Sequence, residues 1–510
     1  MSRIHAPEFP QSLTWLNTDR PLSLECLRGQ VVILDFWTYC CINCLHVLPD
    51  LKYLERKYEG NLTVIGVHSA KFDQERGLEN IRQAILRYDL EHPVLVDEDF
   101  QVWEQYTVKA WPTLVVIDPQ GYYLGSISGE GHLEVLDELV EKLIAEHREA
   151  ETLQRRDWGV VLEKDKGGVR SPLAFPGKVL ADAKSNCLYV ADSGHHRLVV
   201  ASLTGEVLEV IGSGKPGWLD GGFEQAQFYS PQGMTFDAAS EVLYVADMGN
   251  HLLRKVDFRT RQVETVAGTG EQSREIISHG GLGLTTALNS PWDVLKVGER
   301  LLIAMAGSHQ IWEMQLETGW VETYAGNGRE SCVNGSLAAS ALAQPSGIST
   351  DGYELFVADS ESSSIRAVGI VNYPRVRTVC GSGDLFGFGD QDGHGESVLL
   401  QHCLGVEYTQ NYLWVADTYN HKIKRVAHRT GLCQTFFGDG VPGYRDGKAS
   451  ESRFWEPSGL SALGPHLFVA DTNNHKIRLI DLNKFMVTTL EFPGLCAPDV
   501  CVPDVGAVKS

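Results

Sequence analysis

The sequence lacks long apolar stretches and is poor in basic residues. No apolar run approaches the roughly 18–20 residues that a membrane-spanning helix needs, so no membrane partner is expected. The opening residues 1–10 contain no apolar h-region, and we therefore expect a cytoplasmic protein. Lys and Arg number 44 against 66 Asp and Glu, which gives a formal charge of −22. This balance argues against nucleic acid as a main partner, because phosphate binding needs clustered cations.

Cysteine occurs eleven times, mostly as isolated residues without regular spacing. In a reducing cytosol such residues are free thiols, and a C-x-x-C is then catalytic or metal-binding rather than structural. One such motif is present, formed by Cys41 and Cys44. No second C-x-x-C or His pair lies near it in sequence, so zinc is disfavoured and no metal or cofactor is expected. Cys496 and Cys501 form a C-x4-C near the end of the chain, where a disulfide stays an open alternative.

The C-x-x-C follows directly on an apolar run, Val31–Leu34. A strand that leads into a C-x-x-C at the start of a helix is an arrangement used for dithiol–disulfide chemistry. A third thiol, Cys40, stands beside the first cysteine of the motif. The main question set by the sequence is whether this stretch is a working redox site or only a remnant of its fold.

Strand and helix patterns alternate over roughly the first 150 residues. Apolar runs and helical spacing predict strands at 31–36, 62–67, 94–96, 114–117 and 122–128, and helices at 44–58, 75–88, 100–106 and 133–146. This order predicts an α/β domain with helices flanking a mixed sheet. The charged stretch 149–156 is a plausible linker.

The remainder of the chain repeats a short unit of the form Leu-Tyr-Val-Ala-Asp six times. The fifth positions of the copies are separated by 55, 58, 54, 58 and 54 residues and are occupied by Asp192, Asp247, Met305, Asp359, Asp417 and Asp471. Each copy lies within a run of about four short strands, which is typical of a β-propeller blade. An open solenoid is the less favoured alternative, because six compact repeats can close and remove their edges.

These patterns predict a multidomain protein, an α/β domain followed by an all-β six-bladed propeller. We expect the α/β domain over 1–150, a linker over 151–170, the propeller over 171–495 and a tail over 496–510.

The first domain resembles the thioredoxin-like fold, in particular its disulfide reductases with the pattern Phe-Trp-x-x-x-Cys-x-x-Cys. The resemblance implies that Cys41 is the nucleophile and that Cys44 resolves the mixed disulfide. A thiolate at Cys41 would be stabilised by the positive end of the helix dipole. Asp35 stands where the fold carries a buried acid, and Pro112 where it carries a cis proline that faces the cysteines. Trp before the first cysteine is replaced here by Cys40.

The second domain resembles an NHL-repeat propeller, whose units carry Val-Ala-Asp-x-x-Asn-His. The fused order, with Cys-Cys-Ile-Asn-Cys at the redox position, resembles the family of NHL repeat-containing protein 2 and its bacterial relatives. Animal members carry a further β domain, which we expect to be absent because only about 20 residues follow the last repeat strand.

Several residues keep a second interpretation. The two cysteines of the motif could be a fold-derived pair without turnover or, less favoured, a zinc site. Asp35 could move protons during exchange or be an ordinary hydrogen-bonded carboxylate. Pro112 could be a trans strand-start proline. Cys40 is favoured as a small buried hydrophobe, but it could compete with Cys41 for Cys44.

The repeated Asp of the propeller is favoured as a structural residue that bonds a turn backbone, with the nearby His pairing between blades, over a metal or catalytic role.

Three functions remain open from the sequence. The favoured one is a thiol–disulfide oxidoreductase whose propeller docks a protein client or partner through its face and the cleft between the domains. The second is a non-enzymatic interaction scaffold with a degenerate redox site. The third, least favoured, is a propeller lactonase or lyase, which would need an asymmetric set of acids, His or metal at one channel mouth. The client, the electron donor and the oligomeric state are not determined by the sequence.

Overall fold

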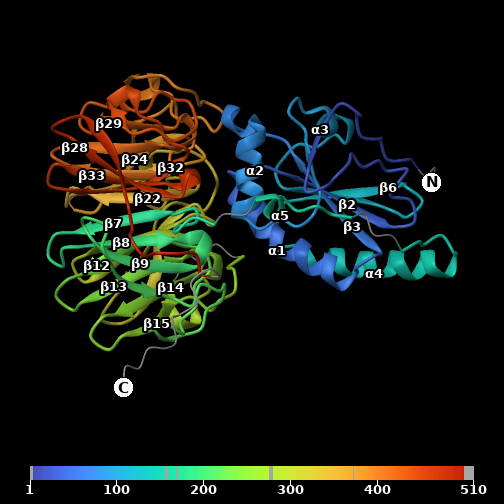
Figure 1. Ribbon diagram of the computed structural model, residues 1–510, viewed down its shortest axis with the longest axis horizontal. Helices are drawn as coiled ribbons and strands as arrows, with labels where there is room; N and C mark the ends of the chain where they lie inside the picture. The colour runs from blue at the N-terminus through green and yellow to red at the C-terminus, as the bar shows by residue number, and fades with distance from the viewer. Residues whose placement is uncertain (1–3, 156–158, 168–169, 275–279, 372, 499–510) are drawn as a thin grey trace. The chain divides into compact units, whose positions relative to one another are not determined.

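The computed structural model describes residues 4–155, 159–167, 170–274, 280–371 and 373–498 and divides the chain into two compact units, Met1–Val169 and Arg170–Ser510 (Figure 1). Most of the predicted tail over 496–510 lies outside the described residues, and so does Cys501, whose pairing with Cys496 the sequence left as an open alternative. Among the described residues, no helix is long and apolar enough to cross a membrane.

The first unit is built on a six-stranded mixed sheet in the order β1-β4-β3-β2-β5-β6. Strands β2, β3 and β4 run parallel, while β1, β5 and β6 pair antiparallel to their neighbours. The strand bounds are β1 Thr14–Leu16, β2 Val31–Trp37, β3 Leu62–His68, β4 Val94–Val96, β5 Thr113–Ile117 and β6 Tyr123–Ser128. The predicted α/β domain with a mixed sheet is therefore confirmed, and β1 is an additional edge strand.

The helices follow the prediction except that the helix expected over 75–88 is interrupted, α1 begins two residues earlier and α5 is additional. Their bounds are α1 Ile42–Lys57, η1 Asp73–Arg76, α2 Leu78–Arg87, α3 Gln101–Gln105, α4 Leu133–Glu149 and α5 Glu163–Gly167. The single helix predicted over 75–88 is wrong, because a 3-10 turn precedes α2 and the two are separated at Gly77. The buried Glu75 carboxylate accepts backbone N–H groups of Lys71 and Phe72, and these bonds fold the chain into the turn.

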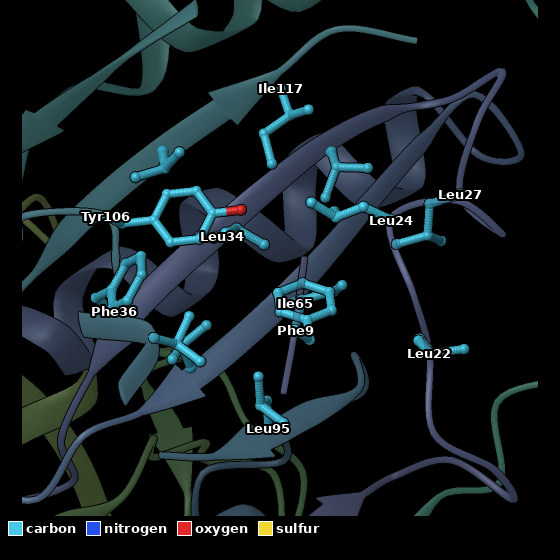
Figure 2. Packing of buried hydrophobic residues seen from close by; sticks show 14 of the residues in the cluster. Phe9, Leu22, Leu24, Leu27, Leu34, Phe36, Ile65, Leu95, Tyr106 and Ile117 are labelled. Carbon is cyan, nitrogen blue, oxygen red and sulfur yellow. The ribbon is translucent and has the colours of Figure 1, made fainter. Parts of the chain in front are cut away.

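Successive residues of β2 point to opposite faces of the sheet and enter two separate cores. Leu34 and Phe36 belong to the core in Figure 2, where they pack with Ile65, Leu95 and residues of the N-terminal segment. Val31 and Ile33 belong to the other core, which also holds apolar residues of α1 and α4: Val47, Leu51, Leu54, Leu136, Val140 and Leu143. By the same alternation, Asp35 and Trp37 continue the row that faces α1.

The segment after α4 packs onto the first unit. Glu163 of α5 accepts a hydrogen bond from Arg82 at 2.8 Å, and its backbone N–H donates to Asn17 at 2.8 Å. Lys164 pairs with Asp89 and Glu91 at 2.8 and 2.7 Å. Residues in the range that we predicted as a linker are thus part of the first compact unit.

The second unit is a six-bladed β-propeller in which each blade is one antiparallel sheet of consecutive strands. Blade one has four strands, and each later blade has a further two-residue strand on its outer edge. The blades consist of β7 Lys178–Asp182, β8 Cys187–Asp192, β9 Arg197–Ser202 and β10 Val207–Ile211; β11 Gly221–Gly222, β12 Pro231–Asp237, β13 Val242–Asp247, β14 Leu252–Asp257 and β15 Gln262–Ala267; β16 Gly281–Leu282, β17 Pro291–Val297, β18 Arg300–Met305, β19 Gln310–Gln315 and β20 Trp320–Ala325; β21 Gly335–Ser336, β22 Pro345–Thr350, β23 Glu354–Asp359, β24 Ser364–Gly369 and β25 Arg375–Cys380; β26 Gly393–His394, β27 Gly405–Thr409, β28 Tyr412–Asp417, β29 Lys422–Ala427 and β30 Leu432–Phe437; and β31 Gly447–Lys448, β32 Pro457–Leu463, β33 His466–Asp471, β34 Lys476–Asp481 and β35 Met486–Leu490. Short 3-10 turns lie between several of these strands: η2 Ser193–His195, η3 Met248–Asn250, η4 Gly283–Thr285, η5 Gly395–Ser397, η6 Thr418–Asn420, η7 Ala449–Glu451 and η8 Thr472–Asn474.

The ring closes by packing blade six against blade one without exchanging a strand. Ser458 of β32 donates to the carbonyl of Gly177 at 2.6 Å, and the backbone N–H of Ala181 in β7 donates to Ser461 at 3.0 Å. The six-bladed propeller expected from the repeats is therefore confirmed as a closed ring.

Candidate functional site

The dithiol lies where strand β2 leads into helix α1. Cys41 is the N-cap residue of α1, and its carbonyl accepts the backbone N–H groups of Cys44 and Leu45 at 3.1 and 3.2 Å. Both cysteines are free thiols. Cys41 is half-buried, whereas Cys44 is fully buried. The helix begins at Ile42 rather than near Cys44, so Cys41 lies directly at the positive end of the helix dipole.

The buried Cys44 thiol is reluctant to lose its proton. Burial raises the pKa of Cys44 well above its ordinary value, and a hydrogen bond to Cys41 and the nearby negative charge of Asp35 raise it further. Cys44 therefore keeps its proton at neutral pH. It needs a neighbouring base before it can attack a disulfide, since the thiolate is the nucleophile.

Asp35 is a candidate for this base, because its carboxyl interacts electrostatically with Cys44. It is fully buried, and neither of its oxygens has a hydrogen-bond partner among the described residues. Burial raises the pKa of Asp35 to about 7, although the charge of His92 opposes the rise. A carboxyl that titrates near neutral pH is better suited to exchange protons than an ordinary one.

Cys40 is held in place through its backbone. Its N–H donates to Glu75 at 2.9 Å, and its sulfur lies 3.9 Å from the Thr38 hydroxyl in a buried environment. The exposed fraction of Cys40 is 3%, compared with the half-buried Cys41 beside it. This placement fits the interpretation of Cys40 as a small buried residue.

Pro112 follows a cis peptide bond with Trp111. The next residue, Thr113, pairs with Phe36 in the register of β5 and β2. Pro112 thus lies at the end of the sheet from which the 38–41 loop departs. Trp111 packs with Trp103 at a ring distance of 4.6 Å, so aromatic side chains gather at this end of the unit.

Sequence reasoning missed three residues of this region. Glu75, inside the helix that we predicted over 75–88, holds the Cys40 backbone. His92 and Glu55 interact at 3.4 Å and are electrostatically coupled to Asp35. Burial lowers the pKa of His92, but the charges of Glu55 and Asp35 outweigh it and raise the value above normal. A charged residue inside an otherwise helical or apolar pattern was the only available signal.

The repeated Asp residues of the propeller each bind backbone and side-chain donors. Asp247 accepts the backbone N–H of Tyr229 at 2.8 Å, the Arg254 guanidinium at 2.9 Å and the Asn250 amide at 2.8 Å. The other four Asp residues likewise bind the backbone N–H of Ala174, Ala343, Gln401 and Trp455 and the cations of Arg197, Arg366, Lys424 and Arg478. Each of these carboxylates is part of the internal bonding of its blade.

The repeated His residues connect neighbouring blades. The backbone N–H of Ser230 donates to His196 Nδ1 at 3.2 Å, and that of Ser290 donates to His251 Nδ1 at 3.0 Å. His475 of blade six accepts the N–H of Phe175 at 3.1 Å, which repeats the bond at the closure of the ring. Among the described residues, no group of three or more His, Cys, Asp and Glu is placed to hold a metal ion.

Charged residues meet near the axis of the propeller. Lys178 of blade one lies 3.2 Å from Asp293 of blade three and donates to the carbonyl of Leu404, which precedes β27 of blade five, at 3.0 Å. Burial raises the pKa of Glu407, from blade five, to about 7, and its carboxyl accepts the Ala462 N–H and the Ser349 hydroxyl. These charges bind one another and the innermost strands.

Both units of this chain match known proteins over a single alignment. A family model described as thioredoxin-like matches residues 29–123. Protein SUPPRESSOR OF QUENCHING 1, chloroplastic, from Arabidopsis thaliana is 46% identical over 511 residues, which cover 96% of this chain and 48% of that protein. NHL repeat-containing protein 2 from Homo sapiens is 42% identical over 522 residues, which cover 96% of this chain and 71% of that protein. The thiol-disulfide oxidoreductase YkuV of Bacillus subtilis is 24% identical over 28% of this chain and 94% of its own length. This chain thus spans about half the length of the plant relative.

Proposed function

Because the chain belongs to the family of NHL repeat-containing protein 2, with a thioredoxin-like domain and an NHL-repeat propeller, we propose that it is a thiol–disulfide oxidoreductase whose propeller docks a protein client. The observation that carries the proposal is the pairing of a half-buried Cys41 at a helix N-terminus with a buried, protonated Cys44. In the proposed reaction Cys41 attacks the client disulfide and Cys44 resolves the mixed disulfide.

The steps follow from this geometry. The Cys41 thiolate attacks one sulfur of a client disulfide, forms a mixed disulfide and releases the other client sulfur as a thiolate. Cys44 gives its proton to Asp35 and attacks the Cys41 sulfur, which releases the second client thiolate. The client gains two electrons, and the protein keeps a Cys41–Cys44 disulfide. A dithiol donor returns it to the reduced form.

An insulin-type disulfide reduction assay tests the proposal. The wild-type chain should reduce the disulfide, and Cys41→Ser should abolish the activity, because the other cysteine at this helix start, Cys44, is fully buried. Cys44→Ser should accumulate a mixed disulfide, whose mass identifies the client. Cys40→Ser is the matched control and should retain activity. Equal rates for the wild type and Cys41→Ser would refute the proposal.

The propeller's part in the proposal is client docking. Trp218 and Leu219 on blade two are about half exposed and line an open groove of about 490 Å³ together with Asp220 and Leu252. Exposed aromatic residues of this kind are common anchors in protein interfaces. Trp218→Ala should reduce the yield of trapped client without changing the reduction of a small disulfide. If the trapped yield is unchanged, this groove does not dock the client.

The scaffold function makes a different prediction. A scaffold would keep its partners when Cys41 and Cys44 are both replaced by serine, whereas an oxidoreductase would lose those held by the mixed disulfide.

We propose a cytoplasmic location, where a reducing environment keeps the dithiol reduced. The plant relative is chloroplastic by name.

A further inference from the structure

The sheet carries no side chain at the position beside Asp35, because that position is Gly66. Gly66 of β3 pairs with Asp35 across the parallel strands. A Cβ atom on Gly66 would lie 2.9 Å from the indole nitrogen of Trp37 and 3.2 Å from Nε2 of His92. The His92 ring therefore reaches the space that a larger residue at position 66 would fill, next to the Asp35 carboxyl.

The polar atoms around Gly66 are buried and lack hydrogen bonds to the described residues. Both Asp35 oxygens, Trp37 Nε1 and His92 Nε2 have no partner among the described residues. A buried polar group without a hydrogen bond is unfavourable, because it loses its contacts with water and gains none in exchange. Because none of these atoms hydrogen-bonds another described atom, a proton moving between them needs one bridging water molecule.

The other nitrogen of His92 faces Glu55. His92 Nδ1 lies 3.4 Å from Glu55 Oε2, and the Glu55 side chain, on α1, is 25% exposed. The imidazole therefore has a buried nitrogen on the Asp35 side and a second nitrogen next to a carboxylate that reaches the surface. An imidazole with two such neighbours can take a proton at one nitrogen and release another from its second nitrogen.

We propose that His92 and Glu55 form a proton exit route through which the proton that Cys44 gives to Asp35 leaves the buried dithiol for solvent. The route rests on the proposed oxidoreductase function and adds two positioning residues to it. When Cys44 attacks Cys41, its proton passes to Asp35. A neutral His92 ring, with its proton on Nδ1 beside Glu55, takes that proton at Nε2 and releases the Nδ1 proton through Glu55 to water. In the reverse direction the same groups return a proton to the Cys44 thiolate as the disulfide is reduced.

Few other titratable groups face Asp35, His92 and Glu55. On β3, burial lowers the pKa of His68 to about 3, so that imidazole is neutral. Glu91, in the same loop as His92, is paired with Lys164 at 2.7 Å. On α1 the facing groups are Cys41, Cys44 and Glu55. Among the described residues, the positive charge of His92, when the ring is protonated, lowers the pKa of Asp35, and the Glu55 carboxylate raises the pKa of His92.

A two-phase titration with a chromogenic aryl disulfide tests the route. Cys41 attacks the reagent and releases one coloured thiolate; Cys44 then displaces the second. The full chain is used with Cys26, Cys187 and Cys332 replaced by serine, and Cys44→Ser identifies the second phase by removing it. In the parent, the second phase should accelerate as the pH rises through the titration of Asp35.

His92→Gln removes the cation, and the midpoint of the second phase should move upward by at least about one pH unit, since a nearby opposite charge is worth that much or more. The second phase should then be about five-fold slower at pH 7. Glu55→Gln should move the midpoint in the same direction, and it remains informative if His92→Gln fails to fold. The first phase should be unchanged in both variants.

His147→Gln is the matched control, because His147 is a buried imidazole of α4 with Asp118 at 3.9 Å, remote from the dithiol in sequence. It should leave the midpoint unchanged. If both phases persist but neither His92→Gln nor Glu55→Gln moves the midpoint, the route is refuted and the oxidoreductase stands. If the parent shows no second phase at any pH, the oxidoreductase proposal is refuted, and the route with it.

Discussion

The ion pair between Asp247 and Arg254 in blade two gives a direct measure of what the repeated Asp does. Both side chains are fully buried and lie 2.9 Å apart. Arg254→Met would leave the Asp247 charge without its cation, and breaking a buried pair in this way costs about 3–5 kcal/mol. Replacing both residues by Met removes both charges, as blade three does naturally with Met305. The double variant leaves mainly the Tyr229 N–H without its acceptor, at a cost of roughly 1–3 kcal/mol.

Hydrogen–deuterium exchange of peptides from blade two, with the full chain in native buffer, reports the free energy of opening of that blade. We expect Arg254→Met to lower it more than the double variant does. Arg259→Met is the matched control, because Arg259 and Glu241 are both more than half exposed and such a pair is worth about 0–1 kcal/mol. If the double variant loses as much stability as Arg254→Met and Asp247→Met lose together, the two charges do not interact and the structural assignment of Asp247 is wrong.

Three further predictions concern the buried charges. Lys178→Met should lower the free energy of unfolding of the propeller by about 3–5 kcal/mol in chemical denaturation, because Asp293 loses its cation; an unchanged midpoint would contradict the axial pairing. Glu75→Gln should accelerate backbone exchange at Cys40 by at least about ten-fold, since a charge-assisted bond worth about 1.5–3 kcal/mol is weakened; unchanged exchange would show that the bond does not hold the loop. In urea unfolding, Asp35→Asn should stabilise the first unit by roughly 3–5 kcal/mol at pH 8 but hardly at pH 4. The pKa of Asp35 is about 7 in the folded chain, compared with an ordinary value of 3.8. The native state therefore binds a proton that the unfolded state has lost, and the wild type loses stability as the pH rises from about 4 to 7. The same stabilisation at both pH values would refute the shift.

The repeats allowed the propeller to be predicted almost completely. Because each blade buries the same apolar row, the strand pattern recurs six times, and five of the six blades place an Asp, such as Asp192 or Asp471, at the equivalent position. The two-residue outer strands, such as Gly221–Gly222, were missed, since two residues carry no periodicity. The axial Lys178–Asp293 pair was also missed, because it joins residues 115 positions apart that only ring closure brings together.

The first unit was predictable in its fold but not in its electrostatics. Apolar periodicity located β2 and α1 to within a few residues, and the C-x-x-C marked the dithiol. The helix predicted over 75–88 failed because helical spacing does not reveal that Glu75 turns inward to bind backbone N–H groups. The partnership of His92 with Asp35 depends on the absence of a side chain at Gly66, which no local pattern reports.

The contrast between the two units bears on where chemistry occurs. In the propeller, a buried carboxylate such as Asp247 accepts hydrogen bonds from a cation, an amide and a backbone N–H, and these bonds stabilise the fold. Asp35 is equally buried, yet neither oxygen is hydrogen-bonded among the described residues. An unsatisfied buried carboxyl destabilises a domain, so its presence beside Cys44 needs a compensating use. Proton exchange with a buried thiol is such a use, because it requires a base that no hydrogen bond already occupies.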